Sequence, residues 1–421
     1  MIIDHVLKEL KWRGFLDKVS NISNLKNIVT KSKIVLYCGF DPTGDSLHIG
    51  HLLPLLCLQW FQKYGHKIII LIGYATSLIG DPSFKNKKRV LELPSNLLCW
   101  SNNIENQIYK IFNKNSFLKP MILNNYHWFK NINVISFLRD IGQFFSVNKM
   151  ISRKFVQNRI NETEKGISFT EFSYNLLQSY DFLHLYKNYG VILQIGGSDQ
   201  WGNITSGINL IHRMYKKQVF GFTMPLLLQS NGIKFGKTEK NQVIWLDSKK
   251  TSPYIFYQFW LNIDDEKIII FLKLFTLIGV DQINEIKLCS KKNINNAKSI
   301  LADQVTEIVH GKKKLYAAKR ITEILFNGNI HDLQESDLLQ LKLDGLPFIQ
   351  VNGSEDLRQA LVNSKLSSSR SDAYRLIISK AIRINNRNEL NPNYVFHSID
   401  KLFGKFTILG KGKKNYFLLC W

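Results

Sequence analysis

The sequence has few cysteines, and they form no recognisable set. Only five of the 421 residues are cysteine, they are scattered, and no two form a C-x-x-C pair. This pattern excludes the disulfide framework of a small secreted domain and the paired ligands of a structural zinc site. We therefore expect a protein of a reducing compartment that holds no metal ion with its own side chains.

Long apolar runs are also absent. No stretch of about 18 or more apolar residues occurs, so no membrane-spanning helix is expected. Residues 1–14 include Asp4, Glu9 and two lysines, and they lack the apolar centre of a secretory signal. These two absences predict a soluble protein of the cytoplasm, with no membrane partner.

Acidic residues are scarce beside basic ones. The chain has 33 Asp and Glu against 56 Lys and Arg, which gives a formal net charge of +23. Such a charge suits a polyanionic partner, RNA above all. Because lysine, asparagine and isoleucine are abundant along the whole chain, only local basic clusters are informative. The clearest cluster lies near the C-terminus: Arg370, Arg375, Lys380, Arg383, Lys411, Lys413 and Lys414.

The length and a hydrophobic content of 45% predict more than one domain. Apolar runs at 34–36, 67–72, 121–123 and 191–195 are typical of buried parallel strands, and helical patterns separate them. This alternation predicts an α/β fold with a doubly wound, Rossmann-like parallel sheet over residues 1–250. Ligands of such sheets bind outside the carboxyl ends of the strands.

The pattern changes after residue 250. Helical periodicity without strand runs predicts a helical domain over 251–328, followed by a linker over 329–353. Residues 354–421 mix helical segments with short apolar runs at 382–384, 406–409 and 416–419. We expect a small α/β domain there, and the basic cluster lies within it.

The end of the first predicted strand carries the most informative stretch, residues 37–51. Glycine and proline break the strand, and an apolar helix follows from Leu52. A helix N-terminus offers unpaired N–H groups and a positive dipole end, which favour an anion. His48 and His51 could both face that anion. Taken alone, however, an H-x-G-H tetrapeptide is a weak signal, and such histidines are more often surface or cap residues.

Two further stretches carry informative motifs, and the first of them follows the predicted strand at 191–195. Residues 196–202 read G-G-S-D-Q-W-G and open a helix in the same way as residues 37–51. Residues 232–238 form a glycine-flanked loop that carries Lys234 and Lys237. This loop is either an ordinary exposed turn or a mobile cationic clamp for phosphates.

These motifs resemble those of a known family. H-I-G-H at 48–51 and K-F-G-K-T at 234–238 resemble the paired signatures of class I aminoacyl-tRNA synthetases. The surrounding segments at 37–43, 80–83, 124–126, 167–174 and 193–203 resemble bacterial tyrosyl-tRNA synthetases, and 365–375 resembles their S4-type RNA-binding domain. The resemblance covers nearly the whole chain, and the motifs appear in the family's order.

The resemblance implies a two-step reaction on tyrosine, ATP and tRNA(Tyr). The tyrosine carboxylate attacks the α-phosphorus of ATP and expels pyrophosphate, and the tyrosyl-adenylate then acylates the terminal ribose of tRNA. A carboxylate is already a nucleophile, so the first step needs positioning and charge stabilisation rather than a protein base. Mg²⁺ is expected with ATP, and no tightly bound cofactor. The implied catalytic residues are Thr43, His48, His51, Lys85, Arg89, Lys234 and Lys237.

The same resemblance assigns the substrate pocket. Tyr37 and Asp181 would read the phenol hydroxyl, although a polar–aromatic face on one helix also suits a half-buried surface. The implied tyrosine-binding residues are Tyr37, Asp81, Tyr174, Gln178, Asp181 and Gln200. The implied ATP-binding residues are Cys38, Gly39, Asp41, Gly50, Gly197, Asp199 and Lys237.

The resemblance also implies a homodimer whose tRNA is bound by the helical domain and the basic tail. The apolar residues of 134–145 are the candidate dimer interface. The chain departs from the family at Tyr74, Ser77 and His127, where Gly, Gly and Asp are usual, and at Asn386, where a hairpin turn usually has Gly.

Three other functions stay open. A different adenylate-forming nucleotidyltransferase would not need residues 251–421. A tryptophanyl-tRNA synthetase shares the fold but would not be expected to carry the S4-like tail. An RNA-binding protein with an inactive synthetase core would bind RNA without forming an adenylate.

Overall fold

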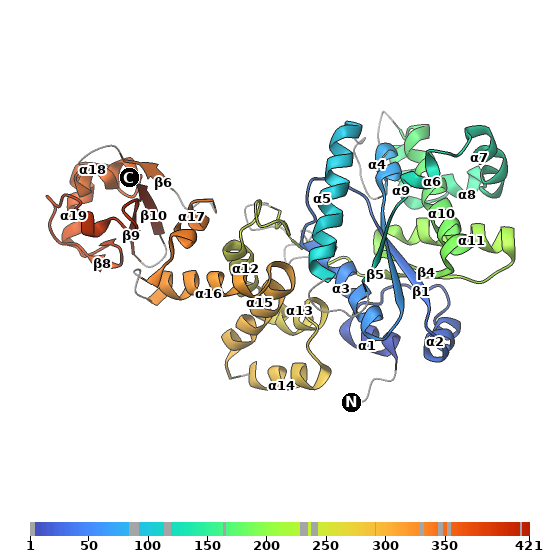
Figure 1. Ribbon diagram of the computed structural model, residues 1–421, viewed down its shortest axis with the longest axis horizontal. Coiled ribbons are helices and arrows are strands. Elements are labelled where there is room, and N and C mark those ends of the chain that lie inside the picture. The colour runs from blue at the N-terminus through green and yellow to red at the C-terminus, as the bar shows by residue number, and fades with distance from the viewer. Residues whose placement is uncertain are drawn as a thin grey trace. The chain divides into compact units, whose positions relative to one another are not determined.

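The structure is a computed structural model, and it describes residues 5–83, 92–112, 119–162, 166–227, 235–236, 243–290, 292–327, 332–343, 348–351, 355–412 and 415–421. The chain divides into two compact units (Figure 1). The first unit comprises Met1–Asp247 and Ile263–Leu301, and the second comprises Ser248–Asn262 and Ala302–Trp421. Each unit is described by itself. The predicted domain boundaries after residues 250, 328 and 353 remain a prediction.

The first unit is built on a five-stranded parallel sheet with the order β3-β2-β1-β4-β5. Its central strand pairs on both sides, for example Tyr37 with Ile69 of β2 and with Gln194 of β4. The doubly wound fold is thereby confirmed, although the edge strand β5 was not predicted. The strands are β1 Val35–Phe40, β2 Lys67–Ile72, β3 Met121–Asn124, β4 Val191–Gly197 and β5 Phe220–Met224.

Helices cover both faces of this sheet (Figure 1). Their ends follow local chemistry: α10 begins with a reciprocal capping box between Ser168 and Glu171 and ends at Gly190, which has a φ of +66°. The helices of residues 5–227 are α1 Val6–Arg13, α2 Ile22–Lys31, α3 Ile49–Lys63, α4 Tyr74–Ile79, α5 Pro94–Phe112, α6 Tyr126–Phe129, α7 Val134–Asp140, α8 Val147–Ile151, α9 Lys154–Glu162, α10 Phe169–Tyr189 and α11 Trp201–Tyr215. The helices α13 Ile268–Phe275 and α14 Val280–Ser290 complete the unit, with residues 294–301 of α15 Ile294–His310.

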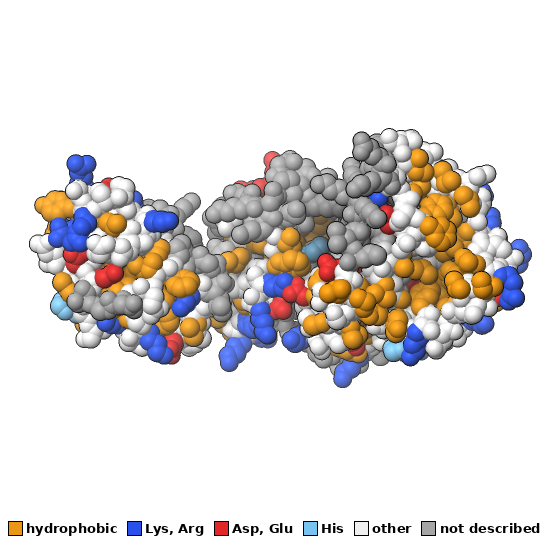
Figure 2. Space-filling view, turned by 90° about the horizontal axis from the view of Figure 1, so that it is seen from above, with side chains coloured by type: hydrophobic (Ala, Val, Ile, Leu, Met, Phe, Trp, Pro, Cys, Tyr) orange, Lys and Arg blue, Asp and Glu red, His pale blue; other side chains and the backbone are white. Residues whose placement is uncertain are grey.

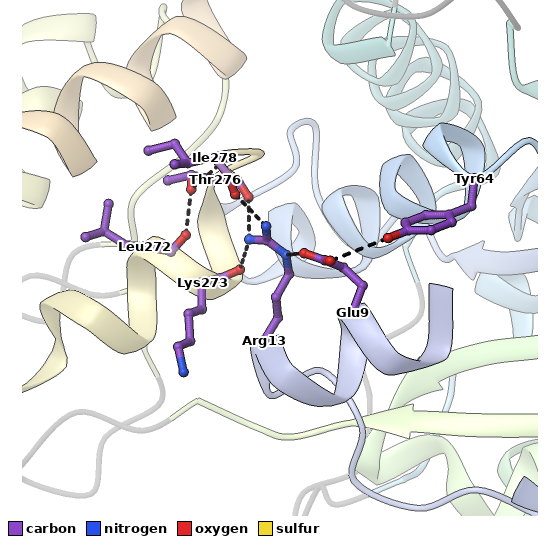
Figure 3. A network of polar contacts seen from close by, with 7 residues as sticks. All are labelled: Glu9, Arg13, Tyr64, Leu272, Lys273, Thr276 and Ile278. Carbon is purple, nitrogen blue, oxygen red and sulfur yellow. Dashed lines mark hydrogen bonds and ion pairs between the residues drawn. The ribbon is translucent and has the colours of Figure 1, made fainter. Parts of the chain in front are cut away.

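A buried arginine joins the N-terminal helix to α13 (Figure 3). Arg13 Nε lies 2.6 Å from Glu9 Oε1, and the two side chains are 0% and 5% exposed. Its Nη1 donates to the carbonyls of Lys273 (2.9 Å) and Thr276 (3.3 Å), and its Nη2 donates to that of Ile278 (2.5 Å). These carbonyls lie at and just beyond the end of α13, where no intrahelical donor is available. The guanidinium therefore caps a helix that is some 260 residues away in the sequence.

The second unit contains a mixed sheet with the order β6-β10-β9-β7-β8. Successive residues of its strands face opposite sides: Ile408 and Leu418 pack against α16 and α17, whereas Leu409 and Leu419 pack against α18 and α19. The short strands predicted near 382, 406 and 416 are thus confirmed. The elements are α12 Pro253–Leu261, α16 Lys312–Asn327, α17 Glu335–Leu343, β6 Phe348–Gln350, α18 Leu357–Asn363, α19 Arg370–Ile378, β7 Ile382–Ile384, β8 Arg387–Asn388, β9 Phe406–Lys411 and β10 Asn415–Cys420.

The predicted hairpin turn at Asn386 joins β7 to β8. Asn385 and Asn386 have φ of +45° and +66°, the left-handed pair that a two-residue hairpin loop requires. Asparagine tolerates this conformation better than most residues, so the turn forms without glycine.

In the part of the chain that the structure describes, no helix is long and apolar enough to cross a membrane.

We predict that Arg13→Met destabilises the first unit by about 3–5 kcal/mol, because it leaves Glu9 buried without its cation. Urea unfolding followed by tryptophan fluorescence measures this loss, since the guanidinium lies 3.8 Å from the centre of the Trp60 ring. Lys405→Met is the control: Lys405 also lies 2.7 Å from a carboxylate, that of Glu335, but both side chains are exposed. Its loss should stay below about 1 kcal/mol, and equal losses would contradict the role given to Arg13.

His66 predicts a pH dependence of stability. Its Nδ1 accepts from the backbone N–H of Ile34 at 3.2 Å, and burial together with nearby Lys33 lowers its pKa to about 4. The unfolded chain, with a histidine pKa near 6.5, takes up the proton first, so stability should fall from pH 6.5 to about pH 4. His66→Gln keeps an acceptor but cannot titrate, and should remove on the order of 1–2 kcal/mol of that fall. Identical pH profiles for the two proteins would refute this.

Candidate active site

A cavity of about 510 Å³ opens at the carboxyl ends of β1 and β4. The chain order reverses between these strands, so the segments that follow them lead to opposite faces of the sheet and leave a crevice. Every predicted tyrosine-, ATP- or phosphate-site residue that the structure describes lines this cavity. They are Tyr37, Cys38, Gly39, Asp41, Thr43, His48, Gly50, His51, Asp81, Tyr174, Gln178, Asp181, Gly197, Asp199 and Gln200.

Six of the predicted site residues lie in segments that the structure does not describe. Lys85, Arg89, Lys234, Lys237, Lys413 and Lys414 lie outside the described residues. In the segments that the structure does describe, no group of three or more His, Cys, Asp or Glu side chains is arranged to hold a metal ion.

Asp181 and Tyr37 form the most enclosed end of the cavity. Both side chains are buried, and Tyr37 Oη has no hydrogen-bond partner. Burial raises the pKa of the Asp181 carboxyl to about 8, and burial beside Asp181 raises the pKa of Tyr37 well above its usual value. A buried hydroxyl without a partner is costly, which favours a polar ligand atom at this position.

Asp181 is held by two side chains that the sequence analysis did not single out. Trp128 Nε1 donates to its Oδ1 at 2.8 Å, and Asn125 Nδ2 donates to its Oδ2 at 3.1 Å. Asn125 in turn accepts from the backbone N–H of Ala75 at 2.7 Å, and Trp128 stacks on the ring of His184. Both donors favour the charged carboxylate and fix the direction of its oxygens. The sequence signal for Asn125 was its position directly after β3, within the segment 124–126 that carries the family resemblance.

A second carboxylate binds the neighbouring face of α10 to the sheet. Asp41 accepts from Tyr174 Oη at 2.7 Å and from Thr76 Oγ1 at 2.8 Å. Burial and the charges of Asp41 and Asp81 raise the pKa of Tyr174 well above its usual value, so the phenol stays neutral. The three predicted α10 residues at 174, 178 and 181 thus face one cavity, as their spacing predicts.

Asp81 and Gln200 meet on the other side of the cavity. Gln200 Nε2 donates to Asp81 Oδ2 at 2.7 Å, and Asn203 Nδ2 donates to Gln200 Oε1 at 3.2 Å. The backbone N–H of Ser83 donates to Asp81 Oδ1 at 2.9 Å. This chain of donors orients one carboxylate and one amide toward the same space.

Two amide oxygens near this space are buried without a donor. They are Gln178 Oε1 on α10 and Gln194 Oε1 on β4, and both residues line the cavity. Sequence analysis assigned no role to Gln194, although a single polar residue within the apolar run 191–195 was a usable signal. Such acceptors indicate a ligand that carries N–H or O–H groups.

The two histidines form the start of α3. His48 is its N-cap, with Nδ1 accepting from the backbone N–H of Gly50 at 3.1 Å, while His51 Nδ1 accepts from the backbone N–H of His48 at 3.2 Å. Their ring centres are 3.9 Å apart. Gly50 is needed here because an added Cβ would lie 2.9 Å from His48 Cε1. Both rings accept at Nδ1, so a neutral ring carries its proton on Nε2.

Burial keeps two side chains near the start of α3 uncharged. Burial and the neighbouring His48 lower the pKa of His51 well below its usual value, so this imidazole is neutral at pH 7. Burial raises the pKa of the Cys38 thiol to about 12, so it is a neutral lining group. The arrangement offers hydrogen-bond donors at a helix N-terminus, which suits a phosphate.

The described residues in and after the lysine-bearing loop lie next to the start of α3. Phe235, Gly236 and Val243 line the cavity, and an added Cβ at Gly236 would lie 2.4 Å from Ile49 Cγ2. The backbone N–H of Ile49 donates to the carbonyl of Ile244 at 3.0 Å. The residues between Lys234 and Lys237 in the sequence therefore touch the start of α3.

The three predicted departures near the pocket do not line it. Tyr74 packs its ring against Tyr126 with centres 5.2 Å apart, and Ser77 Oγ donates to the carbonyl of Gly73 at 2.6 Å. His127 is exposed on α6. The cavity lining is therefore built without these side chains.

The predicted RNA-binding residues lie on the second unit. Arg375 and Lys380 are exposed. Arg370 pairs with Asp356, Arg383 Nη1 donates to Asn386, and Lys411 Nζ donates to the carbonyl of Leu366. These contacts order three of the five described cations, and their role toward RNA remains a prediction.

Two family models match the chain. One, described as tRNA synthetases class I (W and Y), matches residues 30–327. The other, described as a tyrosine–tRNA ligase SYY-like C-terminal domain, matches residues 337–419. Together they cover both the sheet unit and the basic tail, in the order expected from the motifs.

Curated relatives match over their full length. The chain is 56% identical over 423 residues to the tyrosine–tRNA ligase of Buchnera aphidicola subsp. Acyrthosiphon pisum (strain Tuc7), with 99% of each chain covered. It is 51% identical over 427 residues to the tyrosine–tRNA ligase of Escherichia coli O139:H28 (strain E24377A / ETEC), with 100% of each covered.

A solved structure supports the same assignment. The C-terminally truncated mitochondrial tyrosyl-tRNA synthetase of Aspergillus nidulans superposes with a TM-score of 0.70 at 29% identity, over 77% of this chain and 95% of that one. The family models, the relatives and the fold agree with one another. The chain therefore belongs to the class I tRNA synthetases of the tryptophan and tyrosine family.

Proposed function

We propose that the chain is a tyrosine–tRNA ligase, which forms tyrosyl-adenylate from L-tyrosine and ATP and transfers the tyrosyl group to the 3′ end of tRNA(Tyr). One observation carries the choice of amino acid: a buried carboxylate with fixed oxygens lies beside a buried phenol that has no partner. The family and the tyrosine–tRNA ligases at 51–56% identity support the same reaction.

The pair of Asp181 and Tyr37 suits a hydroxyl better than the alternatives. A tyrosine hydroxyl donates to Asp181 and accepts from Tyr37, so both protein groups are satisfied. An indole N–H can only donate, which would leave the Tyr37 hydroxyl unpaired. A phenyl ring would leave both groups buried without partners, and each costs about 1–3 kcal/mol. This argument favours tyrosine within a family that also includes tryptophan enzymes.

The first step is an in-line displacement. One tyrosine carboxylate oxygen forms a bond to the α-phosphorus as the bond to the pyrophosphate oxygen breaks, and the electron pair leaves with pyrophosphate. No proton has to be removed from the nucleophile. The rate therefore depends on alignment and on donors placed where charge develops on the phosphates.

The chain supplies these donors from two sides of the cavity. His48 and His51 offer Nε2 protons at the start of α3, close to Thr43. Gln178, Asp81 and Tyr174 are proposed to hold the tyrosine ammonium group, and Gln200 its carboxylate. Lys85, Arg89, Lys234 and Lys237 are proposed to bind the phosphates, with Mg²⁺ bound to ATP neutralising further charge. Cys38, Asp41 and Asp199 are proposed to face the nucleotide.

The second unit is proposed to bind the tRNA. Its exposed and ordered cations would contact phosphates and orient the RNA, and such contacts weaken as salt is raised. The proposed contacts are Arg370, Arg375, Lys380, Arg383, Lys411, Lys413 and Lys414. We also place the protein in the cytoplasm, where its substrates are.

We further propose a homodimer that uses α7. No residue of this helix is buried, and Val134 and Ile135 are 64% and 68% exposed. Figure 2, which looks onto the side of the first unit that carries α7 and α8, shows hydrophobic side chains gathered on this face. Contiguous exposed apolar surface of this kind marks an interaction site.

ATP–pyrophosphate exchange with each of the twenty amino acids, without tRNA, tests the proposed activity. We expect exchange with tyrosine alone, followed by charging of tRNA(Tyr). Tyr37→Phe should reduce the preference for tyrosine over phenylalanine about tenfold to a hundredfold, because one reader of the hydroxyl is lost. Ser77→Ala, next to the site but outside its lining, is the control.

Three outcomes would change the assignment. Exchange with tryptophan alone would move the chain to the neighbouring enzymes of its family. No exchange from folded protein that still binds RNA would favour an RNA-binding protein with an inactive core. If Tyr37→Phe left the preference for tyrosine over phenylalanine unchanged, Tyr37 would not be one of the residues that recognise the substrate hydroxyl.

Sedimentation tests the dimer. Ile135→Glu should raise the dissociation constant at least about tenfold, because a buried unpaired carboxylate is costly. Leu288→Glu on α14 is a matched control, since Leu288 is also 68% exposed. A wild-type protein that is monomeric, or a dimer lost only with Leu288→Glu, would overturn the proposal.

A further inference from the structure

The segment that leads into α3 is held from two sides. Leu47 is buried directly before the N-cap His48. Its N–H donates to Gln107 Oε1 at 2.9 Å, and its carbonyl accepts from the N–H of Leu246 at 2.8 Å. Gln107 belongs to α5, whereas Leu246 follows the lysine-bearing loop. The backbone just before the histidines is thus fixed by two otherwise separate parts of the first unit.

Ser46 adds to the same junction. Its hydroxyl is buried, lies 3.2 Å from Gln107 Oε1 and 2.8 Å from the Leu47 carbonyl, and accepts from the N–H of Asp247 at 3.3 Å. A single amide oxygen of Gln107 therefore serves two neighbouring donors. Side-chain acceptors of this kind replace the backbone partners that an irregular segment lacks.

Gln107 is itself well anchored. It precedes the buried Ile108 on α5, and Ile104, Ile111 and Phe112 of this helix are buried as well. An acceptor on a packed helix has little freedom to follow a moving partner. It can therefore define the position of Leu47 rather than merely respond to it.

We propose that Gln107 is a positioning residue for adenylate formation, acting through His48 and His51. This inference rests on the proposed function. Without the Gln107 oxygen, the buried N–H of Leu47 has no partner, and the low-cost response is a shift of residues 46–48 toward another acceptor. His48 would move with its backbone, and His51 would follow because its Nδ1 accepts from the His48 N–H.

The effect should be confined to the phosphate side of the site. Tyr37 and Asp181 lie on β1 and α10, and among the described residues the side-chain contacts of Gln107 go to Ser46 and Leu47. Loss of the Gln107 oxygen should therefore slow the chemistry and leave tyrosine binding nearly unchanged. A misplacement on the order of 1 Å can reduce a rate about a hundredfold.

Gln107→Met tests the proposal because methionine has a similar length and no amide oxygen. We expect the single-turnover rate of tyrosyl-adenylate formation at saturating ATP to fall about tenfold to a hundredfold. The tyrosine dissociation constant and the melting temperature should stay close to the wild-type values. Gln107→Glu, which keeps an acceptor oxygen, should retain most of the rate, and Asn106→Ala on the exposed side of α5 should retain all of it.

A double-mutant cycle separates positioning from a general structural role. In a His48→Ala background, Gln107→Met should slow the reaction less than it does in the wild type, because the group it positions is gone. Fully additive losses would overturn the proposal, as would a wild-type rate in Gln107→Met. If Gln107→Met instead weakened tyrosine binding by the same factor as the rate and also lowered the melting temperature, Gln107 would have only a structural role. A wild-type protein without activity would instead refute the proposed function.

Discussion

The placement of β1 between β2 and β4 is the constraint on which the site depends. β1 pairs with β2 along its whole length and with β4 as far as Cys38, so the end of the strand is fixed at the crevice. The chain then turns directly into α3, whose first residues need acceptors for their N–H groups. His48 and His51 meet that need with Nδ1, and this use of Nδ1 leaves Nε2 as the donor. Helix capping thus fixes the two donors that we propose to recognise phosphate.

The cavity is lined by polar atoms that have no hydrogen-bond partner within the protein. Tyr37 Oη, Gln178 Oε1 and Gln194 Oε1 are buried without partners, whereas Asp181, Asp41 and Asp81 have theirs fixed by neighbours. Each unsatisfied group costs stability in the empty protein. A ligand that satisfies all three recovers this cost only if its own groups match. Under the proposed function, the three atoms without partners select the substrate, and the three carboxyl groups with partners keep the site rigid.

Much of this could be predicted from the sequence, because strands, turns and short motifs are local. The four buried-strand runs, the helix start at His48 and the left-handed turn at Asn386 all follow from neighbouring residues. β5 was missed because its sequence F-G-F-T-M has neither a long apolar run nor a clear alternation. Gln107 was missed, and Asn125 was noted without a role, because their partners lie 60 and 56 residues away. No local pattern distinguishes an amide that orients a site from one that faces water.

The contact of Arg13 with α13 has a consequence for how the protein is made. Lys273 and Ile278 follow Arg13 by 260 and 265 residues, so their carbonyls do not exist while the sheet strands are being synthesised. Until they emerge, Arg13 has Glu9 and the Trp60 ring as partners but lacks the three carbonyls at the end of α13. During most of translation the first helix therefore lacks its contacts with α13. The first unit is completed only when residues 263–301 have been made, and these follow residues 248–262 of the second unit.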